Sequence, residues 1–88
     1  MSVDTKRADQ RGFTDYQRAA NLTAQMARGL SRNYWLVQDR SGLYHFVKQQ
    51  GFPDSGVGRA VRDAQLSTLR YLGVVVVEEY DHTGRKVG

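Results

Sequence analysis

Three arginines recur at helical spacing in the second half of the chain. Arg59, Arg62 and Arg70 fall on one face of a helix predicted over residues 56–72, and Leu66 lies among them. The planar guanidinium group can form paired hydrogen bonds with a phosphate or with the edge of a guanine base. An exposed leucine beside guanidinium groups is more typical of an interface than of a solvated surface. This face therefore indicates contact with a polyanion.

The charge of the whole chain points to the same class of partner. The formal net charge is +4 and the isoelectric point is near 9.8, which favours polyanions because each neutralised phosphate releases condensed counterions. The alternative for the arginine face is a solvated surface on which Asp63 pairs with Arg59 across one helical turn. Other candidate cations lie near the two ends of the sequence: Lys6, Arg7, Arg11, His82, Arg85 and Lys86.

Residue types suited to catalysis or metal binding are sparse. The chain has two histidines, His45 and His82, and no cysteine. The paired acids Glu78 and Glu79 are adjacent in a predicted strand, so their side chains point to opposite faces. We expect no enzymatic activity, no metal site and no cofactor.

The length and polarity of the chain predict a single small α+β domain over residues 13–88, preceded by a disordered basic arm at residues 1–12. A helix is predicted over residues 15–30, where Thr14 can cap the first turn and Gln17 can reach back to the cap. No apolar run approaches the length of a membrane span. We therefore expect a soluble, cytoplasmic protein that does not enter a membrane.

Residues 34–50 admit two interpretations. Tyr34–Gln38 and Leu43–Lys48 are rich in β-branched and aromatic residues and flank a polar turn, which predicts a β-hairpin. Residues 43–50 also keep helical spacing. The similar turn sequences at Asp39–Gly42 and Asp81–Gly84 favour the hairpin.

The second half begins after Pro53, which ends the preceding element. Gly73 is expected to end the helix at 56–72, and a strand is predicted over Val74–Tyr80. Because its four successive valines point to both faces, we expect this strand to be central or doubly covered. A tight turn at Asp81–Gly84 leads to a return strand over Arg85–Gly88. The predicted order is α-β-β-α-β-β, with two main helices packed on antiparallel hairpins. The buried face of the second helix is predicted to hold Val57, Ala60, Val61, Ala64, Thr68 and Leu72.

The run GVGRAVRDAQLSTLRYLGVVVVEEYDHTGRKVG, residues 56–88, resembles the C-terminal half of a winged helix-turn-helix DNA-binding domain. In that family the helix enters the major groove and the hairpin, called the wing, lies against a neighbouring phosphate backbone. The resemblance implies groove contacts by Arg59, Arg62 and Arg70. It places three cationic residues in the wing: His82, Arg85 and Lys86.

Three functions are compatible with these patterns. The first is a dimeric DNA-binding regulator, in which the helix at 56–72 contacts bases and the basic arm contacts phosphates. The second is a protein-interaction module, such as an inhibitor or accessory factor of a phage or plasmid, anchored by Leu66, Trp35 and the aromatic hairpin. The third is a single-stranded nucleic-acid binder that stacks bases on Tyr34, Trp35, Tyr44 and Phe46.

Overall fold

The computed structural model describes residues 12–51 and 55–87. Within these residues the order of elements is α2 (Tyr16–Leu30), β1 (Tyr34–Gln38), β2 (Tyr44–Lys48), α3 (Gly56–Tyr71), β3 (Val75–Tyr80) and β4 (Lys86–Val87). This order confirms the predicted α+β fold of type α-β-β-α-β-β. The predicted arm, apart from Gly12, lies outside the described residues. The same holds for its cations Lys6, Arg7 and Arg11.

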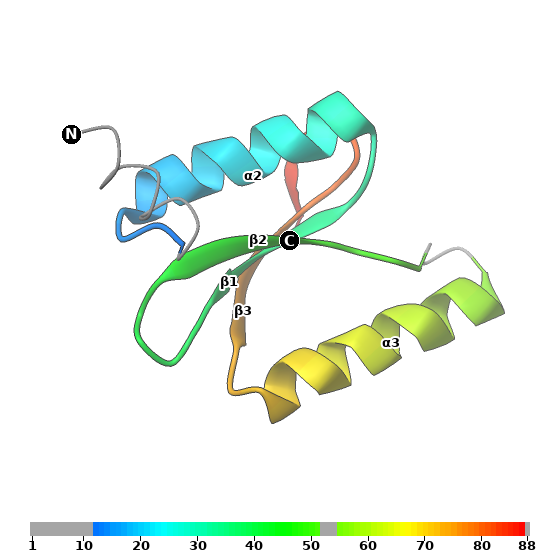
Figure 1. Ribbon diagram of the computed structural model, residues 1–88. Helices are drawn as coiled ribbons and strands as arrows, with labels where there is room; N and C mark the ends of the chain where they lie inside the picture. Colours follow the sequence, from blue (N-terminus) through cyan, green and yellow to red (C-terminus); the bar gives the residue numbers. More distant parts are fainter. Residues whose placement is uncertain (1–11, 52–54, 88) are drawn as a thin grey trace.

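The strands of the described chain form one antiparallel sheet in the order β2-β1-β3-β4. Figure 1 shows α2 on one face of this sheet and α3 on the other. β1 is therefore the strand that is covered on both faces. Its residues Trp35, Leu36 and Val37 are almost completely buried.

The first helix begins one residue later than predicted. Asp15, rather than Thr14, is the N-cap, and its carboxylate accepts a hydrogen bond of 2.7 Å from the backbone N–H of Arg18. A carboxylate at this position is also favoured by the helix dipole. The helix ends at Leu30, and its C-cap Ser31 has a left-handed backbone conformation.

The main core lies between α2 and the sheet. Small side chains on α2 allow the helix to approach the strands closely, and the aromatic side chains of the sheet fill the space between them. The cluster consists of Ala19, Ala20, Ala27, Tyr34, Leu36 and Tyr80.

Residues 34–48 form the predicted hairpin and not a helix. The Asp39 carboxylate accepts hydrogen bonds from the backbone N–H groups of Ser41 and Leu43, and Gly42 has a φ of 88°. This turn chemistry reverses the chain within four residues and pairs Gln38 with Tyr44. The turn at Asp81–Gly84 is built in the same way, and Gly84 donates its N–H to the Asp81 carbonyl at 2.9 Å.

The strand with the four valines is central in the sheet, as predicted, but its valines are not covered on both faces. Val75, Val76 and Val77 are exposed, and β4 pairs only with Glu79 and Tyr80 at the far end of β3. The four valines indicated a central strand, and β3 does lie between β1 and β4, but β4 is too short to reach the valines. Within the described residues, the first half of β3 has a neighbouring strand on one side only.

Candidate nucleic-acid interface

The second helix covers the sheet with a different face from the predicted one. Arg62, Leu66 and Leu69 are partly buried, while Val57 remains 78% exposed and Leu72 56% exposed. The predicted buried face of α3 is therefore turned to solvent. The physical reason lies in the sheet, which presents Trp35 together with the polar side chains of Gln49 and Glu79, so that a long cationic side chain fits against it better than a valine.

Arg62 is part of this internal contact. Its Nη2 atom lies 2.8 Å from Oε2 of Glu79, and its Nε atom donates to Oε1 of Gln49 at 3.0 Å. The guanidinium carbon lies 5.5 Å from the centroid of the Trp35 ring, within range of a cation–π contact. Arg62 was predicted to face the groove of DNA. That placement is wrong, because the side chain is neutralised by the protein's own carboxylate.

Two glutamines that the sequence analysis did not single out anchor α3. Gln49 is buried and donates a hydrogen bond of 2.6 Å to Glu79. Gln65 donates to the Lys48 carbonyl at 2.8 Å and accepts from the Gln50 N–H at 3.0 Å. The only sign of this contact in the sequence was the polar run Gln49-Gln50 directly after β2. A short polar run does not show which distant residues it will bind.

Leu66 is not the exposed anchor that its position among arginines indicated. It is partly buried and lines a groove of about 330 Å³ between α3 and β3. Its neighbours there are Leu69, Arg70, Val74, Val75 and Val76.

The aromatic side chains of the hairpin are also unavailable as a stacking platform. Tyr34 and Trp35 are buried, with Trp35 only 1% exposed, and Tyr44 and Phe46 pack against the core cluster. Base stacking on these rings, and use of Trp35 as a protein-binding anchor, are therefore wrong.

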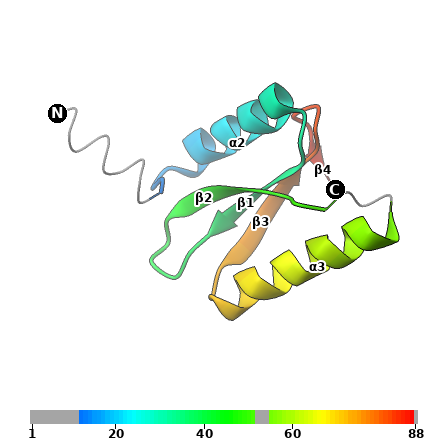
Figure 2. The ribbon, with the colours of Figure 1, turned by 45° about the vertical axis from the view of Figure 1, so that its right-hand side comes forward.

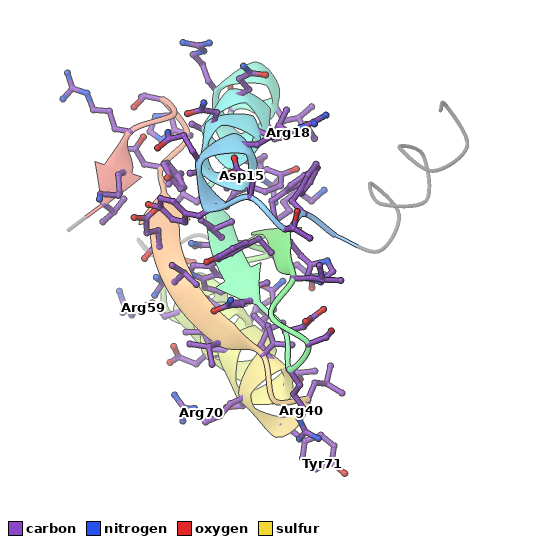
Figure 3. The ribbon with its side chains drawn as sticks, turned by 90° about the vertical axis from the view of Figure 1, so that its left-hand side faces the viewer. Asp15, Arg18, Arg40, Arg59, Arg70 and Tyr71 are labelled. Atoms are coloured by element: carbon purple, nitrogen blue, oxygen red, sulfur yellow. The ribbon has the colours of Figure 1, made fainter. Side chains whose placement is uncertain are left out.

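Four of the candidate cations lie along one edge of the molecule. Figure 3 shows Arg59 and Arg70 of α3 projecting on the side of β3 that faces away from β1. β4 pairs with β3 on that same side and carries the exposed side chain of Lys86, with exposed Arg85 just before it. Figure 2 shows α3 extending beside β3 on the sheet face opposite α2. We call the set Arg59, Arg70, Arg85 and Lys86 the cationic edge.

His82 and Arg40 stand apart from this set. His82 is exposed in the β3–β4 turn, which packs against α2, since a Cβ on Gly84 would lie 3.0 Å from the carbonyl oxygen of Ala24. Arg40, which the sequence analysis did not select, is exposed and extends from the β1–β2 turn to Gly73 at the end of α3. Figure 3 places Arg40 near Arg70, at the opposite end of β3 from the β3–β4 turn.

Two of the acids near the cationic edge, Glu78 and Asp81, are held in internal hydrogen bonds, whereas Asp63 of α3 is exposed. Glu78 accepts from the hydroxyls of Tyr16 and Tyr80 and from Lys86 Nζ at 3.3 Å. Burial alone would raise the pKa of Glu78, but these three hydrogen bonds outweigh it, so its pKa lies below the usual value. The pKa of the Tyr80 hydroxyl is raised by burial and by its hydrogen bond to this carboxylate.

Asp81 is fixed in the turn that precedes β4. Its carboxylate accepts from the hydroxyl and the backbone N–H of Thr83 and from the backbone N–H of Arg85. The hydrogen bonds from Thr83 are the main reason that the pKa of Asp81 is lowered. Asp81 is therefore ionised at neutral pH, but its charge is directed into the turn.

Two cations of the edge, Arg70 and Arg85, are less engaged than these acids. The ion pairs within the described residues are His45–Asp39, Arg62–Glu79 and Lys86–Glu78. Arg70 and Arg85 are exposed and form no ion pair with any described residue. Their guanidinium groups are therefore available to an external anion.

Comparison with known proteins identifies no family model, no curated protein and no solved structure that matches the chain. In the described part of the chain, neither helix has the length and apolar character required to cross a membrane.

Proposed function

We propose that the protein binds nucleic acid, principally the phosphate backbone of double-stranded DNA, through the cationic edge. The observation that carries this proposal is the unequal engagement of charges there. Glu78, Glu79 and Asp81 are each committed to internal hydrogen bonds, whereas Arg70 and Arg85 are exposed without an ion pair in the described residues. Such an edge attracts phosphates more strongly than the net charge of α3 and the C-terminal strands suggests.

The geometry favours contacts with phosphates over contacts with bases. α3 lies on the face of the sheet opposite α2, and Arg62, the arginine nearest its centre, is occupied by Glu79. Arg59 and Arg70 project from the side of the helix, about 16 Å apart along its axis. Phosphate contacts position a protein on DNA but carry little sequence information. We therefore expect weak sequence preference and strong salt dependence.

The salt dependence has a definite size. For a duplex, the logarithm of the binding constant falls with the logarithm of salt concentration with a slope of about −0.9 per neutralised phosphate. If two to four cations of the edge contact phosphates, the slope is about −2 to −4. Single strands give a smaller slope for the same number of contacts, about −0.7 per phosphate.

The experiment is fluorescence anisotropy of labelled random-sequence duplex and single-stranded DNA. The test variant is R70Q/R85Q, which removes two charges from the cationic edge. The matched control is R18Q/K48Q, which removes two exposed charges from α2 and from β2, the strand at the opposite edge of the sheet. The proposal predicts a large loss of duplex affinity for the first variant and a small loss for the second. Equal losses would mean that only net charge matters.

A protein-interaction module without catalytic activity is the second candidate function. It is favoured by the apolar side chains of α3 that the fold leaves in solvent, including Val57, Val61 and Leu72. An exposed apolar surface of this kind is typical of a contact with another protein.

A further inference from the structure

One stripe of α3 has the spacing of a helix–helix contact. Val57, Val61, Ala64, Thr68 and Tyr71 follow one another at intervals of four, three, four and three residues, which places them on one face of the helix. All five are exposed, and Tyr71 is 85% exposed. Figure 3 shows Tyr71 pointing away from the body of the protein. We call these five residues the α3 seam.

The α3 helix gains little from burial within its own chain. Among its residues Gly56–Tyr71, all of which the structure describes, only Gly58 is buried. A helix of this length is marginally stable in water unless an apolar face is covered. The sheet covers the flank that carries Arg62 and Leu66, so the seam is left for another molecule.

The charges around the seam fit a second copy of the same chain. Two copies that each carry a net charge of +4 repel one another wherever cations meet. The seam contains no charged residue. The residues that flank it on the surface of the helix are also uncharged: Gly58, Ala60, Gln65, Ser67 and Leu72. The arginines of α3 lie elsewhere on the helix. The seam therefore has no charge that would attract an acidic or a basic partner. Two seams can approach one another without placing like charges together.

We propose that two copies of the chain pair through the α3 seam, with the helices antiparallel about a two-fold axis near Ala64. In this arrangement Ala64 meets Ala64 of the second copy, Val61 meets Thr68, and Val57 meets Tyr71. The small side chain at the centre allows close approach of the helices, and the large tyrosine ring faces a small valine at each end. Antiparallel helices also place opposite dipole ends together.

The expected dimer is weak. The helix is about 24 Å long, so a single pair of such helices falls below the standard interface of about 800 Å² per partner. We expect a dissociation constant in the micromolar range or weaker, roughly −8 kcal/mol or less in magnitude. This inference is independent of the proposed function, since Arg70 and Arg85 of the cationic edge lie outside the seam.

The first test is a charge swap at Ala64, followed by sedimentation equilibrium from roughly 1 µM to 1 mM. Wild type is expected to show a monomer–dimer equilibrium, and A64E and A64K are each expected to be monomeric because like charges then meet on the axis. An equimolar mixture of A64E and A64K is expected to form a heterodimer. Q25E and Q25K, which place the same charges on the exposed surface of α2, should dimerise as wild type does.

The second test is cross-linking, for which the chain is suited because it has no native cysteine. A mixture of V57C and Y71C chains is expected to form a disulfide-linked heterodimer under mild oxidation, whereas Q25C chains should not. A wild type that stays monomeric across the whole range overturns the proposal. A dimer that persists in A64E, or that is lost when the exposed valines of β3 are replaced, also overturns it. Circular dichroism of A64E and of wild type at the lowest concentration, where both chains are monomeric, distinguishes loss of pairing from loss of folding, because equal helical content there shows that A64E is folded.

Discussion

Arg62 Nη2 lies 2.8 Å from Glu79 Oε2, and this contact joins α3 to the third strand of the sheet. The same guanidinium covers the Trp35 ring on the central strand. Because the contact fixes the rotation of α3 about its axis, it also decides which side chains face solvent. The apolar stripe and the remaining arginines are exposed as a consequence of this partly buried contact and of the hydrogen bonds of Gln65.

The variant R62A is expected to lower the free energy of unfolding by about 1–2 kcal/mol, because it leaves Glu79 without its cation and uncovers Trp35. This loss of stability is smaller than that for removing one partner of a fully buried ion pair, because both side chains of the Arg62–Glu79 pair are 24% exposed. Urea unfolding followed by tryptophan fluorescence measures the change. The control R70A removes an exposed arginine of the same helix and should change stability by less than about 0.5 kcal/mol. Equal effects of the two variants would show that the pair does not hold α3.

Gly51 is expected to tolerate no side chain. A Cβ at this position would lie 1.9 Å from the carbonyl oxygen of Gly58, in the first turn of α3. G51A should therefore push α3 away from the sheet and destabilise the protein by about 2 kcal/mol or more.

The matched control is G29A on α2, where a Cβ would meet nothing within 4 Å. Alanine in place of an exposed helical glycine should stabilise the protein by about 0.5–1 kcal/mol. Thermal unfolding of both variants measures the two effects, which are opposite in sign. Destabilisation by both, or by neither, would contradict the close approach of the chain to α3.

The carboxylate of Glu78 is expected to make stability depend on pH. Its folded-state pKa is below the unfolded value, so its contribution is fully present above the unfolded pKa of about 4.3 and is lost as the pH falls through the folded pKa. E78Q should thus be less stable than wild type near neutral pH, and the difference should shrink below about pH 4. Urea unfolding at several pH values between about 7 and 3 tests this. If the difference in the free energy of unfolding between E78Q and wild type stays constant over this pH range, the effect of E78Q comes from packing and not from the charge of Glu78.

Local signals in the sequence were sufficient for the order of the elements. The Asp39–Gly42 and Asp81–Gly84 turns, and Gly73 with its positive φ, each act within a few residues and occur as predicted. Helix ends were found to within a residue or two, as for the N-cap at Asp15. Such features depend on backbone conformations that single residues favour or restrict.

The orientation of α3 could not be predicted, because it depends on residues far away in the sequence. Apolar periodicity assigned Val57 and Val61 to the core, whereas the sheet presents Glu79 and buried Gln49 at that place. Whether an apolar stripe faces the chain's own sheet or a second molecule is not encoded in its spacing. For the same reason Arg62 and Leu66 were wrongly predicted to be exposed in the candidate site. Arg70 and Arg85 were correctly expected to be exposed.

The salt dependence of duplex binding shows whether Arg70 and Arg85 of the cationic edge contact phosphates. The measurement is the slope of log affinity against log salt between about 50 and 200 mM for wild type, R70Q/R85Q and R18Q/K48Q. If the cationic edge binds phosphates, R70Q/R85Q reduces the magnitude of the slope by about 1.8 and R18Q/K48Q leaves it nearly unchanged. No duplex binding by the wild type at 50 mM salt, or the same slope for the wild type and R70Q/R85Q, would contradict it.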